Sequence, residues 1–69
     1  MSKKEKMALN GTIVSVELLH ELASDSRISD IYLGCTILGM HIKGCRDSRR
    51  EYSQWELHYT DGNRILVYV

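Results

Sequence analysis

The sequence of 69 residues contains no proline and no phenylalanine, and it contains only two cysteines. Trp55 and four tyrosines are therefore its only large aromatic side chains. Cys35 and Cys45 are too few for the disulfide framework of a small secreted domain, so we interpret both as reduced thiols. A chain this short buries only about 60% of the surface that its unfolded form exposes. We expect marginal stability without a partner or a second copy.

The chain also lacks net charge, because nine basic residues balance nine acidic ones. No overall field attracts nucleic acid or an anionic membrane, so any such binding would have to be local. No apolar run approaches the roughly 20 residues that span a bilayer, and MSKKEK is not followed by the apolar core of a signal peptide. We therefore predict a cytoplasmic protein with no membrane partner.

Catalytic and cofactor signatures are missing as well. The sequence has no glycine-rich phosphate loop, and a domain of this size has little volume for a substrate cleft. A zinc site drawn from Cys35, His41, Cys45 and His58 would match no common zinc spacing. We predict that the protein is not an enzyme and has no catalytic residues, no metal and no cofactor.

The chain divides into a short leader and one domain. Residues 1 to 6 contain three lysines and one glutamate, and we expect them to be a disordered leader. Residues 7–69 are expected to form a single small α+β domain. Within it, residues 12 to 24 predict an amphipathic helix with Ser15 or Thr12 as its N-cap. If Ser15 is the N-cap, TIV just ahead of it is a candidate short strand that leads into the helix. The apolar arc of this helix is Val16, Leu18, Leu19, Leu22 and Ala23.

The middle segment, DIYLGCTILGMHIKGC, fits both a strand period and a helical period, so periodicity does not decide between them. Glycines at 34, 39 and 44 are unfavourable in a helix interior, and isoleucine and threonine favour strands. We prefer strands, with a bend or bulge near Gly39. The charged stretch RDSRREYS then forms a loop.

The last seventeen residues, SQWELHYTDGNRILVYV, predict a β-hairpin. A three-residue loop TDG, with Gly62 in the left-handed conformation, places Leu57 opposite Ile65 and Trp55 opposite Val67 on the core face. The fold class that we predict is one amphipathic helix packed on a small antiparallel sheet that ends in this hairpin.

The hairpin register leaves Leu66 and Tyr68 on the second face beside Gln54, Glu56 and His58. Large apolar groups among polar ones are typical of a binding surface, although single exposed apolar residues are common. We predict a partner-binding set of aromatic, apolar and guanidinium side chains, the types that are enriched in binding hot spots: Tyr32, Arg46, Arg49, Arg50, His58, Leu66 and Tyr68. The outer edge of the C-terminal strand is a second candidate surface, where two copies would form a homodimer.

A compact winged helix-turn-helix is the alternative fold. In ELASDSRIS, Leu22, Ala23, Ile28 and Ser29 resemble the first helix and turn of that motif, which would make residues 30 to 42 the recognition helix and the protein a DNA-binding regulator. Arg27 replaces the usual turn glycine, and residues 30 to 42 contain no lysine, arginine, asparagine or glutamine to contact bases or phosphates. Arginines 46, 49 and 50 would then support weak nucleic-acid binding only.

The preferred hypothesis is a small non-enzymatic protein-interaction module. By analogy alone, a compact domain of near-neutral charge without catalytic motifs resembles the phage and mobile-element inhibitors, including the anti-CRISPR class, that act by occupying a surface of a larger host complex. We therefore expect the partner to be a larger host protein or ribonucleoprotein complex that is blocked sterically.

Overall fold

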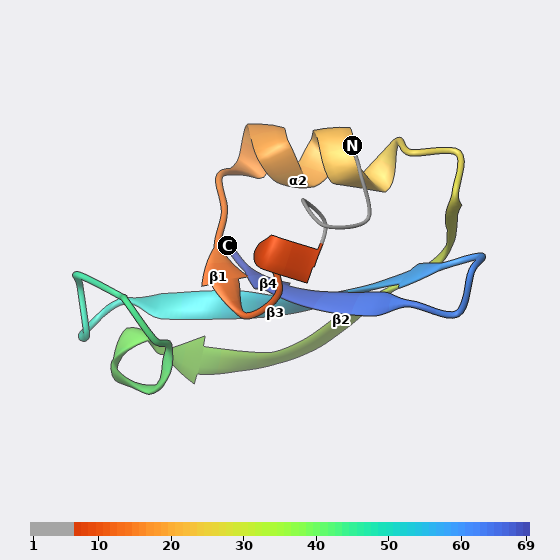
Figure 1. The fold of residues 1–69 in the computed structure, drawn as a ribbon. Helices are drawn as coiled ribbons and strands as arrows, with labels where there is room; N and C mark the ends of the chain where they lie inside the picture. Colours follow the sequence, from red (N-terminus) through yellow and green to blue (C-terminus); the bar gives the residue numbers. More distant parts are fainter. Residues whose placement is uncertain (1–6) are drawn as a thin grey trace.

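The computed structural model describes residues 7–69, and the predicted leader, residues 1 to 6, lies outside the described residues. In the described part of the chain, one helix packs on one face of a four-stranded sheet with the strand order β1-β4-β3-β2 (Figure 1). The elements are β1 (Thr12–Ile13), α2 (Val16–Ala23), β2 (Ile28–Leu38), a short 3-10 turn η1 (Gly39–His41), β3 (Glu51–Tyr59) and β4 (Arg64–Tyr68). This α+β architecture confirms the predicted fold class.

The C-terminal hairpin forms as predicted. β3 and β4 pair with Trp55 opposite Val67 and Leu57 opposite Ile65. The Tyr59 amide donates to the Asn63 carbonyl across 2.8 Å, which leaves three residues in the loop. Gly62 has a φ of 88°, a left-handed conformation that is unfavourable for residues with a Cβ. The loop thereby fixes which side chains of both strands face the helix.

The middle segment is a strand, as preferred, and the winged helix-turn-helix alternative is wrong. Nearly all residues of the expected recognition helix lie in β2 and η1. β2 pairs antiparallel with β3 along most of its length, which excludes a helix there. The register shifts between Leu33 and Thr36, so the bulge lies earlier than expected. At Gly39 the strand ends and the chain turns, which is the predicted bend.

The outer edge of β4 is covered by β1, which corrects two expectations. β1 runs parallel to β4, so the sheet is mixed rather than purely antiparallel. The Gly11 amide donates to the Leu66 carbonyl at 2.6 Å, and the Val14 amide donates to the Tyr68 carbonyl at 2.8 Å. These bonds use the C-terminal strand edge on which we expected a second copy to pair. A homodimer through that edge is therefore not compatible with the fold.

The helix begins and packs largely as its sequence predicts. Ser15 is the N-cap, and its hydroxyl oxygen accepts a hydrogen bond from the Leu18 amide at 3.1 Å. Leu22 is buried, whereas Val16, at the first helical position, is exposed. The main core lies between α2 and the hairpin. Its buried members are Val14, Leu22, Leu57, Tyr59, Ile65 and Val67.

Leu57→Ala should lower the free energy of unfolding by about 2–5 kcal/mol, because Leu57 is 0% exposed and the change leaves a cavity at the centre of the core. Met40→Ala is the matched control, since Met40 is 64% exposed and should lose little. Urea denaturation followed by circular dichroism measures both. Equal losses in the two variants would contradict the assignment of the core to the α2 side of the sheet.

Candidate functional site

One face of the sheet carries no α-helix in the described part of the chain (Figure 1). Along β3, Trp55, Leu57 and Tyr59 point toward the core, so the residues that alternate with them point to the opposite side. Directly paired residues of neighbouring strands share a face, which extends this surface across the sheet. We call it the helix-free face: Asp30, Tyr32, Tyr52, Gln54, Glu56, His58, Arg64, Leu66 and Tyr68.

Glu56 lies at the centre of the helix-free face and organises its polar groups. Its Oε1 atom is 2.7 Å from His58 Nε2 and 3.6 Å from Arg64 Nη1. The His58 ring also meets the Tyr32 ring edge to face, with 4.9 Å between centroids. Four side chains from three strands are thereby held in contact without a helix above them. Such an arrangement can present a preorganised surface to a partner.

A shallow hollow of about 330 Å³ opens on the same face beside Leu66. Leu66 and Gln54 line it together with Glu56, Arg64, Ile65 and Asn10. The Asn10 side-chain oxygen accepts a hydrogen bond from the Leu66 amide at 2.8 Å, which holds it against β4. Leu66 and the Gln54 amide, flanked by the charges of Glu56 and Arg64, can contact a side chain of another protein that has both apolar and polar parts.

The basic loop, residues 43 to 50, lies at one end of the helix-free face. It carries Lys43, Arg46, Arg49 and Arg50 against Asp47. The Arg50 guanidinium is 4.9 Å from the centroid of the Tyr52 ring, a cation–π distance. Asp47 Oδ1 accepts from the Arg49 amide at 3.2 Å, so this carboxylate holds the loop backbone. The loop is thus joined to the sheet through the aromatic ring of Tyr52.

Tyr52 and Ile42 are buried beneath this loop, away from the main core. The Cys45 thiol lies 3.6 Å from the Tyr52 hydroxyl and donates to the Asp47 carbonyl at 3.2 Å. The hydrogen bond with Cys45, and then burial, raise the pKa of the Tyr52 phenol. Cys45 therefore has a packing role in the loop.

The predicted partner-binding residues fall into two groups. Tyr32, His58, Leu66 and Tyr68 all lie on the helix-free face, with Leu66 opposite Glu56 and Tyr68 opposite Gln54. Arg46, Arg49 and Arg50 lie on the basic loop, and Arg50 is the one in contact with Tyr52.

Sequence reasoning missed Asn10, Tyr52 and Arg64 as contributors to this surface. Hairpin alternation was a usable signal for Arg64, since it lies two residues before Leu66 on the same strand. Asn10 gave no local signal, because only the pairing of β1 with β4 carries it to the hollow.

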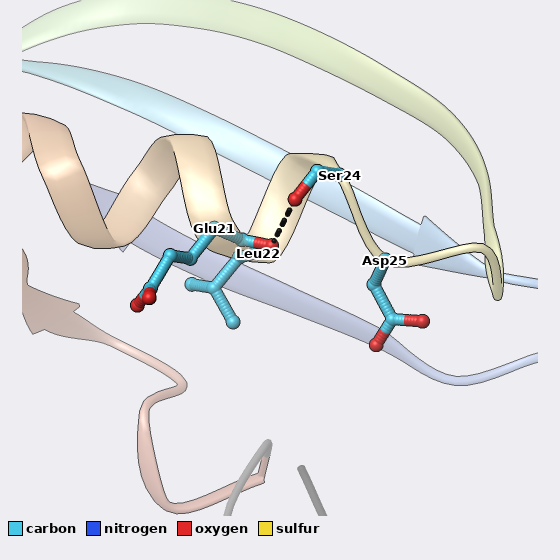
Figure 2. A pocket seen from close by; sticks show the side chains of 4 residues that line it. All are labelled: Glu21, Leu22, Ser24 and Asp25. Atoms are coloured by element: carbon cyan, nitrogen blue, oxygen red, sulfur yellow. Dashed lines mark hydrogen bonds between the residues drawn. The ribbon is translucent and has the colours of Figure 1, made fainter.

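The hollow at the end of α2 offers little chemistry. It measures about 390 Å³ and is lined by Glu21, Leu22, Ser24 and Asp25. Figure 2 shows the two carboxylates on either side of Leu22, while the Ser24 hydroxyl donates to the Glu21 carbonyl at 2.9 Å. The acids are therefore not arranged as a pair.

Residues 7–69 offer neither a metal site nor a membrane-spanning helix. No three histidine, cysteine or acidic side chains come together in a way that could hold a metal ion. No helix within this range is long and apolar enough to cross a membrane. Comparison of the chain with protein family models, with curated proteins and with solved structures found no match.

Gly39→Ala should destabilise the protein by about 1–3 kcal/mol, because an added Cβ would overlap the Asp47 carbonyl and lie 2.6 Å from the Cys45 sulfur. Gly34→Ala is the control, since its Cβ would come no closer than 3.4 Å to another atom. Thermal melts compare the two. A Gly39→Ala protein as stable as Gly34→Ala would contradict the packing of the basic loop against η1.

Asp25 should titrate with a pKa of about 2, below its ordinary value of 3.8, because its carboxylate accepts hydrogen bonds from the Arg27 side chain and amide. The stabilisation is present above pH 3.8 and is lost as the pH falls through about 2. Arg27→Gln should raise this pKa toward 3.8, as measured by carboxyl-carbon NMR. In the control, Arg64→Gln, the pKa of Asp25 should stay near 2. A pKa unchanged by Arg27→Gln would disprove the assigned cause.

Proposed function

We propose that the protein is a small non-enzymatic interaction module that binds a larger protein or ribonucleoprotein complex through its helix-free face and basic loop. The observation that carries the proposal is the composition of that face. Tyr32, Leu66 and Tyr68 lie on it among polar groups that already contact one another, and no α-helix of the described chain covers it.

The chemistry of this face supports protein binding. Tyrosine and arginine are over-represented in binding hot spots because each combines a large contact area with hydrogen bonding. Contacts of Glu56 with His58 and Arg64 hold these side chains before a partner arrives, which lowers the entropy cost of association. An apolar patch rimmed by such groups is typical of a transient protein interface.

The basic loop adds a charge preference. The loop together with Glu51, the first residue of β3, carries a local charge of +2 on a chain with no net charge. Such a cluster favours an acidic surface on the partner and accelerates the encounter at low salt. Its arginines would also contact the phosphates of a ribonucleoprotein, but they are too few for strong nucleic-acid binding alone.

The proposed mechanism is steric inhibition. A domain of 7.9 kDa that covers a functional surface of a larger complex blocks it without chemistry of its own. This mode of action is common to the small inhibitors that phages and mobile elements produce, including the anti-CRISPR class. We place the activity in the cytoplasm, where free thiols such as those of Cys35 and Cys45 persist.

Tyr68→Ala and, separately, Arg49→Ala should each weaken partner binding by about tenfold or more while leaving the thermal melt nearly unchanged, because they remove contact groups rather than core. The measurement is a pull-down from host lysate with and without nuclease, followed by titration of the recovered partner. Val16→Ala is the control, since Val16 is an exposed apolar residue on α2, away from this face.

Three outcomes would decide against the proposal. Equal binding by Tyr68→Ala and Val16→Ala would remove the helix-free face from the interface. Recovery of nucleic acid only, or of proteins that nuclease treatment releases, would favour a nucleic-acid-binding function. Unfolding of both Tyr68→Ala and Arg49→Ala would show that these residues are structural.

A further inference from the structure

The second edge of β2 is a surface whose backbone hydrogen-bonding groups the proposed function does not use, although Tyr32 belongs to both surfaces. β2 pairs with β3 on one side, and no other strand among residues 7–69 pairs with it on the other. It is 11 residues long, about 33 Å at the usual rise per residue. Ile31, Tyr32 and Leu33, in the regular stretch between its two register shifts, are 38%, 53% and 61% exposed. A long apolar edge of this kind is a template for pairing with another strand.

β2 has few of the features with which proteins block a sheet edge. Lysines, prolines, bulges and short strand length are the usual means. Between Ile28 and Leu38 there is neither lysine nor proline, and Asp30 is the one charged residue. The bulge after Leu33 interrupts the second half of the strand, whereas the pairs from Asp30 to Leu33 follow one register. Residues 30 to 33 are therefore open to regular pairing.

The sequence of this stretch is complementary to itself in an antiparallel arrangement. Directly opposite residues in an antiparallel pair share a face, so a two-fold axis must pass through one residue and its own copy. Ile31 and Leu33 lie on the α2 side, opposite Leu57 and Trp55, and Tyr32 lies on the helix-free face. An axis through Tyr32 places Ile31 opposite Leu33 of the second copy and the two Tyr32 rings opposite each other.

Neighbouring registers fit less well. An axis through Ile31 would place Leu33 opposite the polar Ser29 of the second copy. An axis through Leu33 would place Ile31 opposite Cys35, which lies within the bulge where the regular alternation fails. Only an axis through Tyr32 pairs all three exposed apolar residues of this stretch with one another, because Ile31 then lies opposite Leu33 of the second copy and Tyr32 lies opposite its own copy.

Charge is compatible with the same register. Each Asp30 would lie opposite Gly34 of the second copy, so the two carboxylates are four residues apart along the strands, about 13 Å. Like charges therefore do not face each other across the seam. The chain carries no net charge, so two copies do not repel each other as a whole.

The α2 side of the seam is apolar as well. A hollow of about 160 Å³ lies between α2 and β2, lined by Leu19, His20, Ala23, Ile31 and Trp55. In the paired arrangement, Leu33 of the second copy would lie beside Ile31 at the edge of this hollow. The apolar strip would then continue from one copy to the other.

We infer that two copies of the chain pair antiparallel through the free edges of β2, with the two-fold axis at Tyr32, to form one continuous eight-stranded sheet. Both helices lie on one side of this sheet. Both helix-free faces lie on the other side, so the dimer offers a larger partner two equivalent binding surfaces.

Light scattering on a size-exclusion column tests the association. From about 1 μM to about 1 mM, a range that covers weak to moderate dimers, the mass should rise from the 7.9 kDa of one chain toward twice that value. Leu33→Lys should raise the dissociation constant by about tenfold or more, because it places a charge in an apolar seam. Met40→Lys is the matched control, since Met40 is as exposed as Leu33 but lies outside β2, and it should dimerise normally.

Disulfide trapping tests the register independently of stability. In a Cys35→Ser background, Tyr32→Cys should form a covalent dimer on mild oxidation, since residues on the axis have Cα atoms about 4.5–5.5 Å apart, within the range of a disulfide. Met40→Cys in the same background is the control and retains the same Cys45, so it should stay monomeric on a non-reducing gel.

Several results would overturn the inference. A wild-type chain that stays at one chain mass at every concentration would exclude self-pairing and leave the β2 edge to a strand of another protein. Faster trapping at Ile31→Cys or Leu33→Cys would reject the Tyr32 axis. Tyr68→Ala should leave the dimer mass unchanged, so the failure of this inference and the failure of the proposed function are separable.

Discussion

Pairing of β3 with β4 through the three-residue loop is the constraint on which the rest of the structure depends. Gly62 takes the left-handed conformation that this loop requires, and the resulting register buries Leu57, Ile65 and Val67 together under α2. A slip of one residue would place Leu57 on one face with Leu66 and Tyr68, and would leave Ile65 and Val67 on the other face with Glu56 and His58. The hairpin register therefore decides both the core and the helix-free face.

The helix-free face and the free edge of β2 remain open because the described chain has only one short α-helix with which to cover its sheet. α2 has eight residues, a length of about 12 Å, and it packs mainly over the hairpin. Across the described chain, the opposite face of the sheet is covered only near Tyr52, where the basic loop folds back against it. The one α-helix described in this small chain packs on the main core, so the opposite face of the sheet and the edge of β2 remain available for contacts with other molecules.

Local patterns predicted most of the elements correctly, because each depended on neighbouring residues. The N-cap depends only on Ser15 and the Leu18 amide three residues later. The hairpin depends on the alternation of apolar and polar residues on both sides of the loop that contains Gly62. The middle segment was harder, since its apolar residues fit two periods. Pairing with β3 decided in favour of a strand. The covering of the outer edge of β4 by β1 could not be predicted, because nothing in GTIV specifies that these residues pair with a strand more than 50 residues later.

For the candidate site, alternation along the hairpin was sufficient to place His58, Leu66 and Tyr68 on one face. It could not place Tyr32 beside His58, because that contact requires the register between β2 and β3. Sequence by itself determined the amphipathic helix, the hairpin and its two faces, since these depend on side-chain period and turn chemistry over a few residues. Tertiary structure alone decided which strand occupies which edge of the sheet, because strand order depends on hydrogen bonds between segments far apart in the chain.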